Sequence, residues 1–409
     1  KGKTKSKKIV KLTALAGAVM GVVGTAQAVI NTDASTITIS SANPNNVAGT
    51  GQGISNINIG TGANTYRNEG NNVVSHDAIA IGTSATGTGD KAVAIGKNAS
   101  ATKENGIAIG FDATNQSIDS VAIGREATSS KDMDVAIGKQ AKATGGESLA
   151  FGSQSKASGE ATVAVGKEAN SSGSSAVAVG YQSVASHNNV VAVGKNAAAT
   201  AENAVAVGLR ATGSGTRAVS VGAGTAATGN QSLAVGFISK AVGDNSIAQG
   251  NNASSAHTSD IAIGTNAAAN GTDTPAGSST AQNAGTAISI GANSVATGVA
   301  TTALGQAAHA TQNGAVAVGS LANATNKAAA AFGRDSNASG ESSTALGSGA
   351  KASANYSFAA SVNANASGVQ SIAIGRSAEA SGEQSLAQGS SAKATAKDAV
   401  AVGTEANAT

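Results

Sequence analysis

Short apolar segments that end in glycine recur at every fourteenth position along most of this 409-residue chain. In KAVAIGKNASAT, residues 91–102, Val93 and Ile95 alternate with alanine and precede Gly96. Apolar residues two positions apart share one side of an extended strand, whereas on a helix they lie on opposite faces. A glycine in every repeat would also cost a helix about 1 kcal/mol each time. The pattern therefore predicts short strands and excludes a coiled coil, although the repeat has the length of two heptads.

The repeat frame runs to the end of the chain with one interruption. The closing glycine recurs without a slip from Gly82 to Gly264, and the frame resumes from Gly291 to Gly403, with Ser361 as the single exception. We expect these glycines at tight turns or at positive φ. The structural turn glycines predicted in the first part of the frame are Gly82, Gly96, Gly110, Gly124, Gly138, Gly152, Gly166, Gly180, Gly194 and Gly208.

Each repeat has room for two strands, such as 92–95 and 99–101, joined by two turns. Internal repetition on this scale is typical of solenoids. The sequence thus predicts an all-β fold, a parallel β-solenoid of 14-residue coils. About 24 coils stacked at ~4.8 Å would form a rod on the order of 110 Å long.

The first strand of each coil is apolar on both faces, which predicts that it is buried on both sides. The second strand of the coil covers one face, and the sequence predicts no helix to cover the other. We expect another copy of the chain there, in a closed symmetric oligomer.

Gln249 and Gln388 stand in the slot of the last apolar residue of the segment. We interpret them as core polar residues, which need hydrogen-bond partners. Two explanations stay open. Either the layer is wet and loosely packed, or amides of symmetry-related copies bond to one another and fix the register.

Residues 1–28 have the features of a secretory signal peptide: a basic start, an apolar stretch over positions 12–24 and an Ala-x-Ala site that ends at Ala28. The apolar part is too short to span a bilayer. We expect cleavage after Ala28, export across the inner membrane, and a lead-in segment over residues 29–53. Because residues 1–28 hold six lysines and no acid, the formal net charge of +3 becomes −3 in the mature chain. That balance leaves no basic patch for a nucleic acid.

Few residues could support catalysis or metal binding. The chain has no cysteine, which excludes disulfides, thiolate ligands and cysteine nucleophiles. His187 and His257 share one slot of the repeat but lie five coils apart, about 24 Å, too far to share a metal ion. We expect them, with His76 and His309, to be solvated turn residues. Hydrolase, phosphate-loop and calcium-repeat motifs are absent from the sequence, so we predict no enzyme activity, no cofactor and no metal site.

Two interruptions of the repeat are the candidate ligand-binding loops. One lies between Gly60 and Gly82 and contains Tyr66 and Arg67. The other covers residues 265–285, and its candidate residues are Thr272, Asp273 and Pro275. Insertions in solenoids often sit on a binding face, but surface loops also tolerate insertions without a function. These boundaries divide the head repeats into arrays over residues 54–264 and 286–409.

Units such as SIAIGRSAEASGEQ, residues 371–384, resemble the YadA-like head domain of trimeric autotransporter adhesins. The resemblance covers roughly residues 54–409. It implies a left-handed parallel β-roll, a homotrimer, and a place on the outer membrane surface of a Gram-negative cell. It also implies attachment to an extracellular matrix protein such as collagen, or to a host cell surface, and autoaggregation. Family members continue into a neck, a stalk and a C-terminal membrane anchor, whereas these repeats run to Thr409. Membrane association is therefore expected only through an anchor that this chain does not contain.

The resemblance favours a cell-surface adhesin head that binds through many weak contacts and performs no catalysis. The alternative is a structural rod or spacer, with adhesion carried by another domain. An ice-binding solenoid would need threonine in the same slot of each coil, and the threonines here are scattered.

Overall fold

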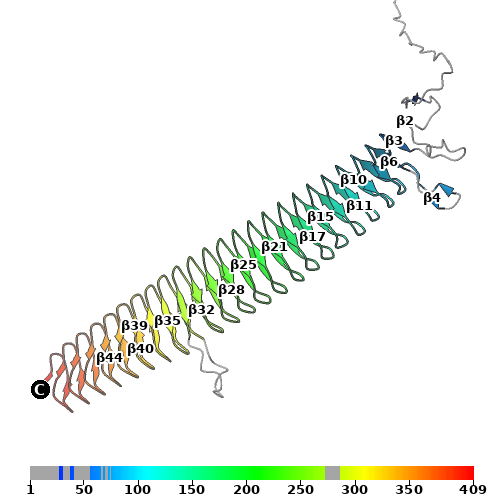
Figure 1. Ribbon diagram of the computed structural model, residues 1–409. Helices are drawn as coiled ribbons and strands as arrows, with labels where there is room; N and C mark the ends of the chain where they lie inside the picture. The colour runs from blue at the N-terminus through cyan, green and yellow to red at the C-terminus, as the bar shows by residue number, and fades with distance from the viewer. Residues whose placement is uncertain are drawn as a thin grey trace, which may run out of the picture.

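The computed structural model describes residues 27–30, 37–40, 56–65, 68–69, 72–73, 75–271 and 286–409. Over the repeats the chain forms one long rod of stacked coils, which confirms the predicted parallel β-solenoid (Figure 1). Left-handed coiling stays a prediction from the family resemblance.

Each coil contributes one strand to each of two parallel sheets. The even-numbered strands from β6 (Ile79–Ile81) to β50 (Val400–Val402) occupy the three residues before each repeat glycine. The odd-numbered strands from β7 (Thr86–Gly87) to β51 (Asn407–Ala408) begin four residues after it. They span two residues, except β33 (Ala268–Asn270) and β35 (Val295–Thr297), which span three. The predicted strands 92–95 and 99–101 are thus confirmed to within one residue, as β8 (Val93–Ile95) and β9 (Ser100–Ala101).

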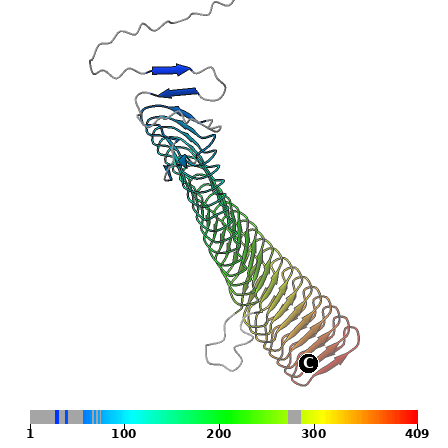
Figure 2. The ribbon, with the colours of Figure 1, turned by 90° about the vertical axis from the view of Figure 1, so that its right-hand side faces the viewer.

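Every strand from β6 to β51 pairs in parallel with its equivalent one coil away. Along the first sheet Val93 pairs with Ile107, and Ile107 pairs with Val121, so equivalent residues of successive repeats form continuous columns. A slip of one residue would turn every side chain to the opposite face. The register therefore places each sequence slot at one fixed position on the surface of the rod, as the stacked coils of Figure 2 illustrate.

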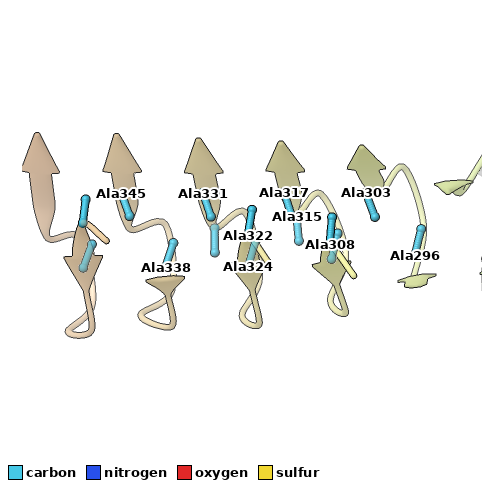
Figure 3. Packing of buried hydrophobic residues seen from close by; sticks show 14 of the residues in the cluster. Ala296, Ala303, Ala308, Ala315, Ala317, Ala322, Ala324, Ala331, Ala338 and Ala345 are labelled. Atoms are coloured by element: carbon cyan, nitrogen blue, oxygen red, sulfur yellow. The ribbon is translucent and has the colours of Figure 1, made fainter. Parts of the chain in front are cut away.

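The interior of the rod is made mostly of alanine methyl groups. Ala94 in the first sheet, and Ala99 and Ala101 in and beside the second, are fully buried. Their equivalents in the other coils form four such clusters along the rod, the largest running from Ala218 to Ala401 (Figure 3). Because each coil closes on itself within a single repeat, its two sheets leave room mainly for small side chains, and alanine is accompanied by serine, threonine and a few larger residues such as Val190 and Asn115. The larger residues, such as Val93 and Ile95, point outward and are only half-buried.

This arrangement corrects one expectation about the core. Gln249 in β30 (Ile247–Gln249) and Gln388 in β48 (Leu386–Gln388) lie outside the alanine core and are exposed. Their slot belongs to the outer face of the first sheet, so in the single chain they are not core residues. The sequence could not distinguish the faces, because both are apolar.

The repeat glycines adopt the expected positive φ, between 122° and 139°. A side chain at Gly180 would also place its Cβ 2.4 Å from the carbonyl oxygen of Gly194 in the next coil. The glycine is therefore needed both for its backbone conformation and for the close approach of neighbouring coils. Ser361 occupies the same slot at a φ of 106°, a region that L-residues rarely adopt.

At the N-terminal end, β1 (Gln27–Ile30) pairs antiparallel with β2 (Ile37–Ser40), and β2 pairs in parallel with β3 (Ile57–Ile59). The expected lead-in segment thus contains strand β2. The expected cleavage site after Ala28 lies within β1, and residues 1–26 lie outside the described residues. β4 (Asn68–Glu69) and β5 (Asn72–Val73) form a separate antiparallel pair.

The second interruption starts later than the sequence predicted. Residues 265–271 complete an ordinary coil, because β33 pairs with β31 (Ser254–Ser255) and with β35. β32 (Ile261–Ile263) pairs directly with β34 (Ile288–Ile290), so the two predicted arrays form one continuous solenoid. Within the second interruption, residues 272–285 lie outside the described residues. The predicted start of the interruption at residue 265 is wrong, because the repeat frame continues to Gly271.

Candidate interaction surfaces

The outer side of the first sheet carries two columns of apolar side chains along the rod. We call these columns, the first and third residues of β6 to β50, the apolar face. Most of their members are half-buried, but Phe151 and Leu346 are about half exposed, at 50% and 49%. Among the described residues, no segment packs over this face. The sequence predicted a partner on one face of this strand without identifying the face, and the described residues leave this outer one uncovered.

Gln249 and Gln388 interrupt the third-residue column of the apolar face. Gln249 is in register with Val235 and Ile263, and Gln388 with Ile374 and Val402. Each amide is therefore flanked by aliphatic side chains. Any surface that covers the apolar face must offer the two amides hydrogen-bond partners or water.

The turn after each repeat glycine forms one edge of the rod, and its first residue is often basic or aromatic. Lys97 lies over the ring of Phe111, with its Nζ 5.8 Å from the ring centroid. Lys167 and Lys195 lie over the ring of Tyr181, at 5.6 and 5.8 Å. These distances are within the range of cation–π attraction. The contacts order exposed side chains into a ladder along this edge.

The second residue of the same turn adds a ladder of hydrogen bonds. The amide of Gln140 donates to the carboxylate of Glu126 at 2.6 Å, and Gln154 donates to Gln140 at 3.2 Å. Gln182 donates to Glu168 at 2.7 Å. This bond, and a smaller contribution from Lys167, hold the pKa of Glu168 below its ordinary value. Amides and carboxylates thus tie successive coils together at the surface.

The longer turn between the second strand and the next coil forms the opposite edge, which is rich in acids. Asp132 accepts hydrogen bonds from Ser117 Oγ at 2.6 Å and from the Ile118 N–H at 3.1 Å. These bonds lower the pKa of Asp132. Asn188 uses its side-chain oxygen in the same way on the Ser174 N–H, at 3.0 Å. An acceptor in this slot therefore holds the turn of the preceding coil.

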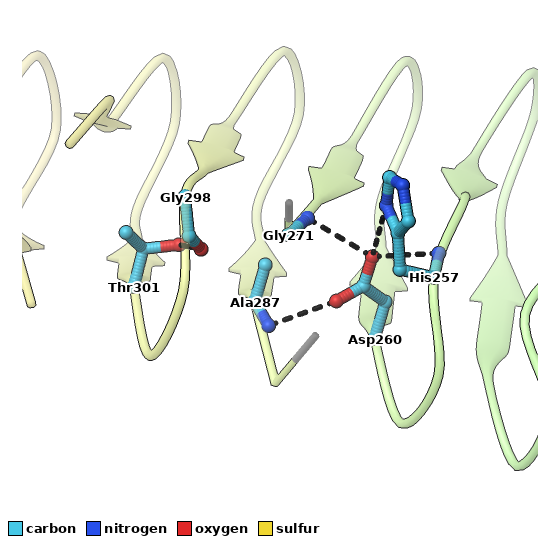
Figure 4. Close-up of polar contacts among 6 residues, drawn as sticks. All are labelled: His257, Asp260, Gly271, Ala287, Gly298 and Thr301. Atoms are coloured by element: carbon cyan, nitrogen blue, oxygen red, sulfur yellow. Dashed lines mark hydrogen bonds and ion pairs between the residues drawn. The ribbon is translucent and has the colours of Figure 1, made fainter. Parts of the chain in front are cut away.

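A fully buried carboxylate fastens the two ends of the second interruption (Figure 4). Asp260 accepts hydrogen bonds from the N–H groups of His257 at 3.0 Å and of Gly271 at 3.1 Å. Its other oxygen accepts the N–H of Ala287 at 2.9 Å, and His257 Nδ1 lies 3.7 Å from the carboxylate. Gly271 and Ala287 flank the inserted residues, so Asp260 holds the coil together where the chain leaves and re-enters it.

Asp134 occupies the same slot in another coil and is also fully buried. It accepts the N–H groups of Lys131 and Gly146, both at 2.9 Å, and the hydroxyl of Ser148 at 2.6 Å. Most coils have alanine, serine or threonine here. Thr301, for example, donates to the Gly298 carbonyl at 3.0 Å (Figure 4). Our sequence interpretation missed both aspartates, although a charge in this small-residue slot was a visible signal.

The predicted loop residues lie outside the part of the chain that the structure describes: Tyr66, Arg67, Thr272, Asp273 and Pro275. Their proposed role in ligand binding stays a prediction.

The histidines are dispersed over the surface. His76, His187 and His309 are exposed, and His257 is half-buried beside Asp260. Within the described ranges, no group of three or more His, Cys, Asp and Glu side chains could hold a metal ion. That part of the chain also has no helix long and apolar enough to cross a membrane.

Comparison with known proteins agrees with the fold. A search of curated proteins found no match to the chain. The family model of the YadA head domain repeat, which represents two copies of the repeat, matches through most of the rod. The matched residues are 88–113, 117–141, 129–154, 143–169, 171–197, 191–211, 199–225, 214–237, 227–253, 241–267, 283–308, 296–322, 324–350, 338–360, 362–378 and 380–406. These matches cover well over half of the chain and follow the coils that the structure shows. The chain therefore belongs to the family of YadA head domain repeats.

Proposed function

We propose that this chain is the head of a bacterial cell-surface adhesin and acts as a homotrimer by multivalent, non-catalytic binding. Membership of the YadA head family supports adhesion, because heads of this family belong to trimeric autotransporter adhesins. The observation that carries the assembly is the apolar face, which runs along the coils from β6 to β50 and is left uncovered by the part of the chain that the structure describes.

Three copies with their apolar faces turned toward a common axis would cover all three faces at once. Burial of apolar surface contributes about 25 cal/mol per Å², and the face repeats in every coil from β6 to β50. A closed ring leaves no open apolar face, so it also avoids growth into filaments. The second sheets and the turns would remain outside and available to a ligand.

The proposed ligand is a collagen-like extracellular matrix protein or another component of a host cell surface. Repeated contacts on three parallel rods would add through effective concentration, so each contact can be weak. The same surfaces could join heads of neighbouring cells and cause autoaggregation. The proposed location is the outer membrane surface of a Gram-negative cell, reached after export by the N-terminal signal.

The interruptions are the proposed ligand-binding loops, because they break the 14-residue repeat frame that the sequence otherwise keeps between Gly60 and Gly403. Deletion of residues 272–284 restores the repeat frame and leaves Gly271, Gly285, Thr286 and Ala287 as an ordinary turn. Because Gly271 and Ala287 are retained, both partners of Asp260 at this junction are kept.

The test compares adhesion of the purified full chain and of this deletion variant to immobilised collagen and to host cells. The proposal expects the full chain to bind, and the loop hypothesis expects weaker binding by the variant. Equal binding would exclude the second loop as a site. Failure of the assembled full chain to bind either surface would favour the alternative, a structural rod or spacer.

A further inference from the structure

Two slots of the repeat, one on each edge of the rod, carry charges of opposite sign, although adjacent slots also hold charges of the other sign, such as Glu126 and Lys103. Every charged residue directly after a repeat glycine is a cation, and all of these cations are exposed; we call them the basic edge: Lys97, Arg125, Lys139, Lys167, Lys195, Arg334 and Arg376. Seven positions further along, in the opposite turn, most charges are acids; we call them the acidic edge: Asp90, Glu104, Asp132, Glu160, Glu202, Asp244, Glu341 and Glu383. Only Lys327 and Lys397 place a positive charge in that slot.

Cations and acids of the two edges occur in the same coils. Five coils carry both, as the pairs Lys97 and Glu104, Arg125 and Asp132, Lys195 and Glu202, Arg334 and Glu341, and Arg376 and Glu383. The two members of a pair stand at opposite ends of the strands, so they do not meet within one chain. Three basic-edge cations instead pair with the acid that follows them in the same turn, as in Arg125 with Glu126 at 3.2 Å. On the acidic edge, Glu383 pairs with Lys397 of the next coil at 3.5 Å.

Turn geometry alone does not account for the acids. The acceptor that the turn needs can be an amide, as in Asn230 and Asn355, which accept N–H groups at 3.1 and 3.0 Å. Glutamates such as Glu104 and Glu202 fill the same slot and make no such bond in the structure. Their charge is therefore free to serve another purpose on the surface.

The position of the apolar face determines which edges of two adjoining copies would lie side by side. The face lies between the two edges, because the first-sheet strand joins the long turn to the glycine turn in every coil. When flat faces meet around an axis parallel to the rods, each copy places one edge beside the opposite edge of its neighbour. An antiparallel arrangement would place like edges together, which costs energy.

We propose that the basic edge of one copy contacts the acidic edge of the next, and that this contact makes the copies parallel and aligned coil by coil. The inference rests on the proposed trimer and specifies its partner surfaces. Alignment follows from the charges, because cation and acid occur in the same coil and both are concentrated before residue 210. When parallel copies are aligned coil by coil, the charge-rich half of each basic edge lies beside the charge-rich half of the neighbouring acidic edge. In antiparallel copies, the charge-rich half of each rod would lie beside the weakly charged half of its neighbour.

The test reverses charge on one edge at a time in the full chain. A basic-edge variant carries Lys97→Glu, Lys195→Glu and Arg376→Glu, and an acidic-edge variant carries Glu104→Lys, Glu202→Lys and Glu383→Lys. A third variant combines all six changes. The control variant, Lys142→Glu with Lys156→Glu and Lys351→Glu, makes the same change of charge on exposed positions of the second sheet, away from both edges.

Sedimentation equilibrium at low and high salt then measures self-association. We expect each single-edge variant to dissociate at a concentration at least tenfold higher than the unchanged chain at low salt. The combined variant should recover the original affinity, and the differences should shrink at high salt because exposed charges are screened. Loss of association that the combined variant does not recover, or no loss in either single-edge variant, would overturn the proposal.

Orientation is tested separately with the paired substitutions Val362→Cys and Val369→Cys, which place one cysteine on each edge of a single C-terminal coil of a chain that has no cysteine of its own. Parallel, aligned copies should form disulfide links between the two edges of neighbouring copies, and antiparallel copies should not. If heparin binds the assembled chain through the basic edge without affecting assembly, that edge is free and the proposal is wrong. A chain that does not self-associate at all would refute the trimer itself, so the two failures are distinguishable.

Discussion

Substitution of a repeat glycine should damage the rod locally and strongly. In Gly180→Ala the new residue would have to keep a φ of 135°, and its Cβ would lie 2.4 Å from the Gly194 carbonyl oxygen. Backbone strain of this kind costs about 1–3 kcal/mol, and forced overpacking costs a further 1–3 kcal/mol or so. We therefore expect a loss of about 2–6 kcal/mol in the stability of the affected coils.

Gly314→Ala provides a matched control, because it makes the same chemical change without the clash. Gly314 has a φ of 71°, and the nearest atom to an added Cβ is 3.8 Å away. Ala328 occupies the same slot one coil later at a φ of 53°, so alanine is tolerated there. The expected cost is about 1–2 kcal/mol. The entropy that each substitution removes from the unfolded chain is the same and cancels in the comparison.

Hydrogen exchange resolved along the chain is the suitable assay, because solenoids unfold locally rather than as one unit. Gly180→Ala should increase exchange in the coils around residues 166–194, with distant coils unchanged, whereas Gly314→Ala should change exchange only slightly. Similar protection of the two variants around their substitutions would refute the argument that close approach between coils makes these glycines necessary.

Three further predictions follow from particular side chains. Ser361→Gly should raise thermal stability by about 1 kcal/mol, because it relieves a serine held at a φ of 106°; an unchanged or lower melting temperature in calorimetry would contradict this. Asp260→Asn should destabilise the coil by about 1–3 kcal/mol, because the amide brings a donor toward N–H groups that need an acceptor; the reasoning fails if proteolysis at residues 272–285 is no faster than in the unchanged chain. The lowered pKa of Asp132 means that its contribution to stability is present above the ordinary aspartate pKa and is lost as the pH falls through the lowered value. Asp132→Asn should therefore flatten the acid limb of stability against pH, and an identical acid limb in both chains would exclude this role.

Gln249 offers a separate test of the outer face. Because its amide is exposed in the single chain and flanked by Val235 and Ile263, Gln249→Leu should leave the coil folded, as circular dichroism can confirm. If amides of neighbouring copies bond to one another, the variant should lose specificity for one oligomeric size in light scattering. An unchanged size and melting curve would favour the wet-layer explanation.

The repeat frame made most of the fold predictable from sequence. Alternation around Val93 and Ile95 predicted the strands, and the glycine slot predicted positive φ, because both follow from local backbone geometry. The choice of inner face was not predictable from polarity, since alanine and valine are both apolar. It depends on the narrow space inside each coil, which small side chains, mostly alanine, fill.

The surface was predictable only in part. The basic slot after the glycine was visible in Lys97 and its equivalents, but its meaning depends on which turn lies opposite, and this becomes clear only when the coil closes. The role of Asp260 depends on Gly271 and Ala287, which the chain brings together across the inserted residues. A contact of this kind, between residues far apart in the chain, is visible in the sequence only because Asp260 places a charge in a slot that usually holds a small residue.

The central claim is that copies of this chain cover one another's apolar faces. The most direct test is the mass of the purified full chain by sedimentation equilibrium, with circular dichroism of the same sample. The account predicts a β-rich particle with three times the 38.7 kDa of the full chain, or of the processed chain if the signal has been removed. A folded, β-rich monomer at the same concentration would contradict it, because the apolar face would then be stable in water without a partner.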